Sequence, residues 1–326
     1  MRHNHESRRR PSPAAILLVP VVVALVLALF AWPSARLEPR DLPVGVAGPA
    51  DATRALTQKL ESDPDAFDVS AYGSEAAARD AIEDREIYGA FVAGPSGAKV
   101  LTASGASPAV AQALTHAATE VGGGAGAGPA VEDTVPAPRG AALGASVLPL
   151  LIAGILTGVL STVLASGAAG RVALLVTGSV LSGLVATAIV QSWLDVVGGD
   201  WAANAAALSL TVLAIASIVA GLKSLLGEAG AALGALTMIL IGNPFSAVAT
   251  APELLPRPAG GIGQLLPPGA GAGLLRSTGY FDGAAAGGHI AVLAAWTCAG
   301  LALLGVAAWR MRTAGGRSLA PASSPA

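Results

Sequence analysis

The stretch that decides the fold is residues 143–241, which opens with LGASVLPLLIAGILTGVLSTVLAS (Leu143–Ser166). Three more apolar blocks follow it with almost no charge: Val172–Gln191, Asn204–Leu222 and Ala229–Val248. Each block reaches or approaches the ~20 residues that a helix needs to cross ~30 Å of hydrocarbon. The middle of the chain therefore predicts four membrane crossings.

One further apolar block lies near each end of the chain, at Ala14–Trp32 and His289–Trp309. The first could be a signal peptide, but its apolar run is longer than such a segment needs, and Trp32-Pro33-Ser34-Ala35 is a poor cleavage site. We interpret it as an uncleaved anchor. The chain is 53% hydrophobic and 12% charged, against roughly 25% charged in soluble domains. We therefore expect an α-helical polytopic membrane protein with six transmembrane helices.

Residues 33–121, between the first and second predicted spans, have the composition of a soluble domain. Their alternating apolar runs predict strands at 44–47, 67–72, 87–93 and 99–103, with helices between and after them. This order indicates parallel crossover units, and hence an inserted extracytoplasmic α/β domain. Residues 33–141 hold fifteen acidic and eight basic side chains. That excess indicates mostly a solvated face, with a cationic ligand as the alternative.

The predicted organisation has the α/β domain at 33–121 and a Gly/Pro-rich linker at 122–141. The parts around them are a tail at 1–13, the first span at 14–32, a membrane domain at 142–309 and a tail at 310–326. Lysine and arginine favour cytoplasmic loops, and one orientation places the following residues there: Arg2, Arg8–Arg10, Arg171, Lys223, Arg310, Arg312 and Arg317. We therefore expect a multi-pass plasma-membrane protein with both termini cytoplasmic.

Several classes of function are disfavoured by what the sequence contains. A net charge of −2 without a basic face argues against nucleic-acid binding. A single cysteine, Cys298, leaves no thiol metal cluster, and His116 and His289 have no partner at a recognisable triad spacing. We predict no catalytic residue, no metal site and no cofactor, so the chain is not expected to be an enzyme.

The predicted spans contain small residues in place of charges. No ionisable side chain lies near the middle of any span, which weighs against a carrier driven by proton or sodium gradients. Gly154-x-x-x-Gly158 and Gly230-x-x-x-Gly234 are spaced for close helix approach. We expect these glycines to be helix-packing positions.

Residues 249–288 are too apolar for a solvated loop and too broken by proline and glycine for another crossing. Half-helices that dip back from the outer face satisfy both observations; a loop lying on the membrane surface is the alternative. In the re-entrant interpretation, an exit gate would draw on residues in and just before this segment: Asn243, Pro244, Glu253, Gln264, Pro267, Pro268 and Arg276.

The order of these parts resembles the membrane subunits of type-2 ABC exporters, in particular the actinobacterial phage-infection-protein-like branch. In residues, the resemblance rests on Gly242-Asn243-Pro244-Phe245 and Leu265-Leu266-Pro267-Pro268-Gly269. It implies a permease that works as a homodimer or heterodimer in the lipid bilayer with a separate nucleotide-binding subunit. The chain has no Gly-x-x-x-x-Gly-Lys-[Ser/Thr] motif of its own. Only Gly167–Arg171 separates the second and third spans, where that family usually carries its coupling helix.

Two functions follow from these observations. The first is an export-type permease subunit powered by a separate ATPase, with an unknown substrate. The second is a membrane-anchored extracytoplasmic binding or scaffold protein of the cell envelope without transport activity, which the short cytoplasmic loops and uncharged spans favour.

Overall fold

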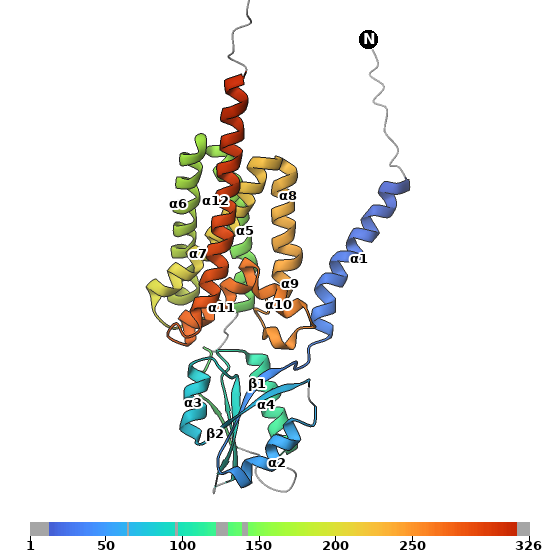
Figure 1. The fold of residues 1–326 in the computed structure, drawn as a ribbon, viewed down its shortest axis with the longest axis vertical. Helices are drawn as coiled ribbons and strands as arrows, with labels where there is room; N and C mark the ends of the chain where they lie inside the picture. The colour runs from blue at the N-terminus through green and yellow to red at the C-terminus, as the bar shows by residue number, and fades with distance from the viewer. Residues whose placement is uncertain (1–12, 64, 95–96, 122–129, 139–142, 318–326) are drawn as a thin grey trace, which may run out of the picture.

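The computed structural model describes residues 13–63, 65–94, 97–121, 130–138 and 143–317. It is mostly helical, with a mixed α/β region at one end of its long axis (Figure 1). The described chain begins and ends at the other end of that axis, far from the sheet. The two parts are joined through the segment between the last two long helices.

The sheet of the α/β region has five strands in the order β2-β1-β3-β4-β5. β1 pairs in parallel with β2 and β3, β3 pairs antiparallel with β4, and β4 pairs in parallel with β5. The expected crossover units therefore account for the first three strands, whereas two residues between β3 and β4 are too few for a crossover. The strands are β1 (Leu42–Ala47), β2 (Phe67–Tyr72), β3 (Gly89–Gly94), β4 (Gly97–Thr102) and β5 (Ala130–Asp133).

β5 lies within residues 122–141, which the sequence analysis assigned to a linker. Four residues without a long alternating pattern gave no strand signal. Charge holds the strand in place: Glu132 accepts from Arg79 at 2.7 Å and lies 2.5 Å from Lys99 Nζ. The α/β region thus extends beyond Val121. Of the predicted linker, residues 122–129 and 139–141 lie outside the described residues.

Helices cover both faces of the sheet. Successive side chains of a strand point to opposite faces, so one strand can contribute to two cores. Phe91 and Val100 pack under two helices on one face, while Ala90 and Leu101 pack under one helix on the other. The helices of the first face are α2 (Ala50–Leu60) and α4 (Pro108–Val121), and that of the second is α3 (Glu75–Glu83).

The helical part is arranged around α7 (Trp201–Leu226), of which 72% of the most apolar window is buried, against 22–33% in the other long helices. Its neighbours therefore turn apolar side chains outward, among them Leu156, Leu181 and Leu233, each more than half exposed. The other elements are α1 (Pro13–Ala35), α5 (Leu143–Leu164), α6 (Gly167–Thr187), η1 (Ala188–Trp193), α8 (Glu228–Leu236), η2 (Thr237–Gly242), α9 (Asn243–Phe245) and α12 (Ala286–Arg317).

Five stretches of this helical part are long and apolar enough to cross a membrane: Val147–Leu164, Gly167–Trp193, Trp201–Leu226, Glu228–Phe245 and Ala286–Thr313. α1 adds the shorter apolar stretch Pro20–Ala35 and stands apart from the others along most of its length (Figure 1). Outward apolar faces on long helices are what a lipid environment requires. The chain has the character of a multi-pass membrane protein.

The helices are connected very differently at their two ends. Away from the sheet, Ala165 and Ser166 separate α5 from α6, and Gly227 alone, at φ 65°, separates α7 from α8. Toward the sheet, an irregular segment follows α9. Its elements are η3 (Pro252–Leu254), α10 (Ala259–Gln264) and α11 (Pro267–Tyr280).

The irregular segment between α9 and α12 fixes the α/β region to the helices. Leu254 joins the core under α2 and α4, and Phe281 joins the core under α3. The Glu38 N–H also donates to the Leu254 carbonyl at 3.2 Å. Both hydrophobic cores of the α/β region therefore include a residue of this segment. The segment lies between the sheet and the long helices (Figure 1).

Candidate functional site

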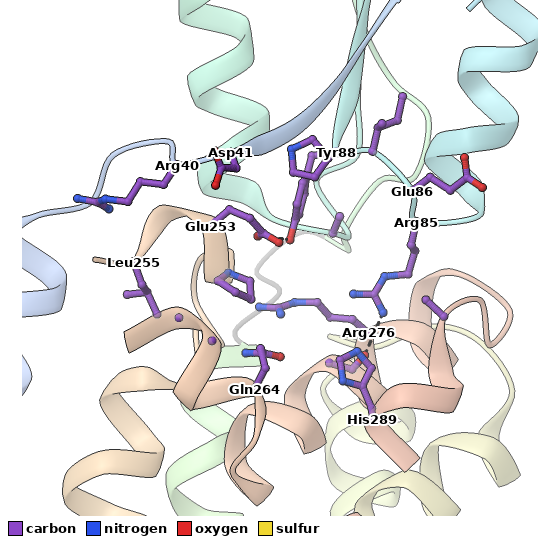
Figure 2. Close-up of a pocket in the computed structure, with 18 of the residues that line it drawn as sticks. Arg40, Asp41, Arg85, Glu86, Tyr88, Glu253, Leu255, Gln264, Arg276 and His289 are labelled. Atoms are coloured by element: carbon purple, nitrogen blue, oxygen red, sulfur yellow. Dashed lines mark hydrogen bonds between the residues drawn. The ribbon is translucent and has the colours of Figure 1, made fainter. Parts of the chain in front are cut away.

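A cavity of about 880 Å³ lies where the α/β region meets α10, α11 and the start of α12. Figure 2 shows charged and polar side chains entering it from both sides. From the α/β region come Arg85 and Tyr88; from the helical side come Glu253, Arg276 and His289. Because these groups come from segments distant in sequence, the cavity exists only in the folded chain.

Arg85 reaches the cavity from an unusual backbone position at the end of α3. Its N–H donates to the Ile82 carbonyl, and the Glu86 N–H donates to the Ala81 carbonyl. This is the hydrogen-bond pattern of a Schellman motif, in which the left-handed residue is usually glycine. Arg85 occupies that place with φ 62°. A left-handed non-glycine residue costs roughly 1 kcal/mol, so the chain tolerates local strain at this arginine.

The Arg85 side chain is held by groups of the helical part. Nη1 donates to the Gly273 carbonyl at 3.1 Å and to Ser277 Oγ at 2.5 Å. Its guanidinium carbon lies 5.3 Å from the centre of the Phe281 ring, within cation–π range. Burial lowers the pKa of Arg85 from its ordinary value, yet an arginine remains charged at any physiological pH. A permanent positive charge is therefore fixed at the roof of the cavity.

Arg276 brings a second positive charge from α11 and is only 5% exposed. Its Nη2 lies within hydrogen-bonding distance of three backbone carbonyls, at 2.8 Å from Ala247, 2.7 Å from Val248 and 3.1 Å from Thr250. These carbonyls follow α9, where the chain leaves the helix, and of the three only that of Ala247 has a backbone partner among the described residues, the Thr250 N–H at 3.1 Å. Arg276 therefore fastens this turn to α11 while its stem crosses the cavity below Arg85 (Figure 2).

One carboxylate faces the two arginines. Tyr88 Oη donates to Glu253 Oε2 at 2.8 Å, which joins the α/β region to η3. Burial, followed by the neighbouring Glu253 charge, raises the pKa of Tyr88 above its ordinary value. Tyr88 is thus a neutral donor at physiological pH, and it engages one oxygen of Glu253.

The rim of the cavity holds ion pairs, and its floor holds an imidazole and an amide side chain. At the rim, Arg40 pairs with Glu38 and Arg257 pairs with Asp41. At the floor, His289 and Gln264 lie below Arg276 (Figure 2). A methyl group added at Gly273 would collide with the His289 ring, so a glycine there lets the imidazole lie against α11.

The structure brings three of the predicted gate residues together, because Glu253, Gln264 and Arg276 all line this cavity. The other four lie apart from it. The Asn243 carbonyl accepts from Ser246 Oγ at 2.7 Å, and Pro244 follows it in α9. Pro267 and Pro268 are buried in the first turn of α11, where a missing N–H costs no helical hydrogen bond.

The four predicted packing glycines all lie at close helix contacts. A Cβ at Gly154 would be 2.7 Å from Ile215 Cγ2, and one at Gly158 would be 2.6 Å from the Ala216 carbonyl oxygen. A Cβ at Gly234 would be 3.2 Å from Val219 Cγ2. Gly230 lies against the Leu222 carbonyl across the tight α7–α8 turn. These contacts place α5 and α8 directly on α7.

The cavity residues that sequence reasoning missed include Arg85, Tyr88 and His289. The sequence places Arg85 among the basic side chains of a mostly solvated face, and it places His289 at the start of the last span, with no partner at a recognisable triad spacing. Nothing local marks Arg85, since a Schellman motif predicts glycine at its position. Tyr88 lies at the start of a predicted strand, where an aromatic residue usually indicates packing.

The described residues contain no group of three or more His, Cys, Asp or Glu side chains that could hold a metal ion. The cavity offers a set of hydrogen-bond donors that includes the buried Arg276 and the partly buried Arg85. Its lining also holds three carboxylates, of Asp41, Glu86 and Glu253. Pockets that bind small molecules orient them with a few polar groups of this kind. Comparison with known proteins finds no family model, curated protein or solved structure that matches this chain.

Proposed function

We propose that the chain is a six-span plasma-membrane protein that presents a ligand-binding cavity on its extracytoplasmic side. In this arrangement α1 supplies the sixth crossing, both termini are cytoplasmic and the α/β region lies outside. The observation that supports it is the cavity itself, which lies at the opposite end of the helices from both ends of the described chain. The preference of lysine and arginine for cytoplasmic loops supports the same orientation.

The binding or scaffold function agrees better with the geometry than an ATP-driven permease does. The turns on the predicted cytoplasmic side, Ala165–Ser166 and Gly227, are too short to present a helix to an ATPase. By contrast, the outer side holds the irregular segment, the α/β region and an 880 Å³ cavity. Among the described residues, the cavity that could recognise a ligand therefore lies on the proposed outer side.

The permease subunit remains a second candidate because of one specific observation. α10 and α11 are short helices broken by proline and glycine that lie at the outer ends of the long helices, as the resemblance to type-2 exporters implies. Co-purification of an ATP-binding subunit from native membranes would favour this candidate over the binding protein.

The orientation is tested by thiol labelling in a Cys298→Ser background. Asp80 and Glu228 are both exposed, and they lie at opposite ends of the molecule. Asp80→Cys should react with a membrane-impermeant maleimide in intact cells, and Glu228→Cys only after lysis. The reverse pattern would overturn the proposed topology.

The binding function is tested by filling the cavity. Gln264→Trp places a large ring at its floor, whereas Leu236→Trp changes an outward position of α8 that is 52% exposed. Native mass spectrometry of the purified proteins should detect a co-purifying small molecule on the wild type and on Leu236→Trp that is lost from Gln264→Trp. Equal occupancy of all three proteins, or none in the wild type, would contradict a ligand site here.

A further inference from the structure

We propose that the cavity binds a phosphate-bearing anion between Arg85 and Arg276, an inference that rests on the binding function proposed above. It assigns a ligand class to the site, opposite in charge to the cationic ligand that the acidic excess of the α/β region leaves as an alternative. Three features of the described residues support it: the pairing of the charges, the unused donors of the two arginines and the backbone strain at Arg85.

The charges of the cavity are paired at the rim and unpaired at its centre. Arg40 and Arg257 each have a carboxylate partner. In the described part of the chain, no carboxylate oxygen lies within 4 Å of a side-chain nitrogen of Arg85 or Arg276. Buried cations are costly unless they are paired. Arg276 is buried and Arg85 partly buried, so an anionic ligand would add a direct partner to the counter-charge of Glu253, which acts on both arginines without an ion pair.

Each arginine also keeps hydrogen-bond donors in reserve. Among the described residues, Arg85 donates only through Nη1 and Arg276 only through Nη2. In the described residues, the buried side-chain atoms without a hydrogen-bond partner are Arg171 Nε and Ser179 Oγ. No nitrogen of Arg85 or Arg276 is among them. The remaining side-chain nitrogens of Arg85 and Arg276 are therefore not completely buried, and both residues line the cavity. The planar guanidinium fork matches the spacing of phosphate oxygens.

The backbone at Arg85 argues that its side chain has a use beyond packing. Glycine would fit the left-handed position at the end of α3 without strain. Arginine at φ 62° is a strained residue whose side chain ends in a cavity, and such strain concentrates at ligand sites. A ligand that needs the guanidinium group at this position would account for the strained backbone.

A phosphate group could reach this site free in solution or as part of a lipid headgroup. Ile262 of α10 and Leu265, the residue after α10, line the cavity and are 41% and 64% exposed. They form an apolar edge next to the charged centre, so an acyl chain could lie along α10 with its headgroup at the arginines. Both sources share the same phosphate chemistry, and the experiment separates them.

The test measures binding to the purified full-length protein in detergent. The probes are inorganic phosphate, phosphatidylglycerol, and diacylglycerol as the lipid that lacks phosphate. Titration calorimetry reports phosphate binding, and native mass spectrometry reports the lipids. We expect Arg85→Gln to weaken binding at least about tenfold, the loss typical of one charge-assisted hydrogen bond. Arg257→Gln, at the paired and exposed rim, should bind within about twofold of the wild type.

A glycine variant separates binding from folding. Arg85→Gly relieves the backbone strain, so it should keep a thermal midpoint close to that of the wild type while losing the same affinity. Binding of phosphatidylglycerol without phosphate supports a headgroup site; binding of phosphate alone supports a soluble anion. Diacylglycerol binding equal to phosphatidylglycerol, or unchanged affinity in both Arg85 variants, would overturn the proposal.

Failure of this inference can be told apart from failure of the proposed function. If neither phosphate probe binds, yet Gln264→Trp still displaces a native ligand, the cavity binds a molecule of another class. If Gln264→Trp displaces nothing as well, the binding function itself is wrong.

Discussion

Replacing Arg276 with methionine should destabilise the irregular segment between α9 and α12 more than the same change at an exposed arginine does. Nη2 has two N–H groups, so it can make two strong hydrogen bonds at once among the three nearby carbonyls. Hydrogen bonds from a charged group contribute about 1.5–3 kcal/mol each. The substitution also removes a buried charge, which offsets part of the loss. We expect the free energy of unfolding to fall by about 2–4 kcal/mol.

The assay is SDS titration in mixed micelles, followed by tryptophan fluorescence. Trp296 Nε1 donates to the Leu265 carbonyl at 2.8 Å, so its emission, isolated by replacing the other four tryptophans with phenylalanine, reports on the segment between α10 and α11. Arg310→Met, at an exposed position near the end of α12, serves as the matched control and should change stability by less than about 0.5 kcal/mol. If Arg276→Met were as stable as this control, the carbonyl contacts would not hold the segment.

Three further predictions follow from other contacts. Gly158→Leu should destabilise the α5–α7 contact by about 1–3 kcal/mol in the same titration, whereas Gly305→Leu, which faces open space, should not. Tyr88→Phe should lower the unfolding free energy by about 1.5–3 kcal/mol through loss of its hydrogen bond to a carboxylate; an unchanged value would contradict that bond. Arg79 and Lys99 hold the pKa of Glu132 at about 2, below its ordinary 4.5. Its stabilising effect should therefore be complete above pH 4.5 and disappear as the pH falls to 2, and Glu132→Gln should abolish that part of the pH dependence of the unfolding midpoint.

Both candidate functions would use the same cavity. A binding protein needs the arginines to hold its ligand, and an export permease would need the same groups to release a substrate outward. The geometry agrees better with the first because the residues that flank α10 and α11 are packed into the α/β region. Leu254 and Phe281 belong to the cores of the α/β region, so movement of the outer segment as a gate would disturb that region too.

Much of the fold follows from the sequence because its signals are local. Twenty apolar residues without charge indicate a membrane helix whatever surrounds them, and alternating residues indicate strands. The predicted blocks therefore match the long helices, and the first four strands lie where alternation indicated them. β5 escaped prediction because its place in the sheet depends on pairing with β4 and on two cations from other elements.

The sequence by itself determined that long apolar helices dominate this protein, that an α/β region interrupts them, and that proline and glycine break residues 249–288. Only the tertiary structure decided where the polar groups of that segment point. Tyr88 and Glu253 are 165 residues apart, and Arg85 and Ser277 are 192 apart. Contacts over such separations depend on how the sheet is placed on the helices, and no local pattern of hydrophobicity or charge records that placement.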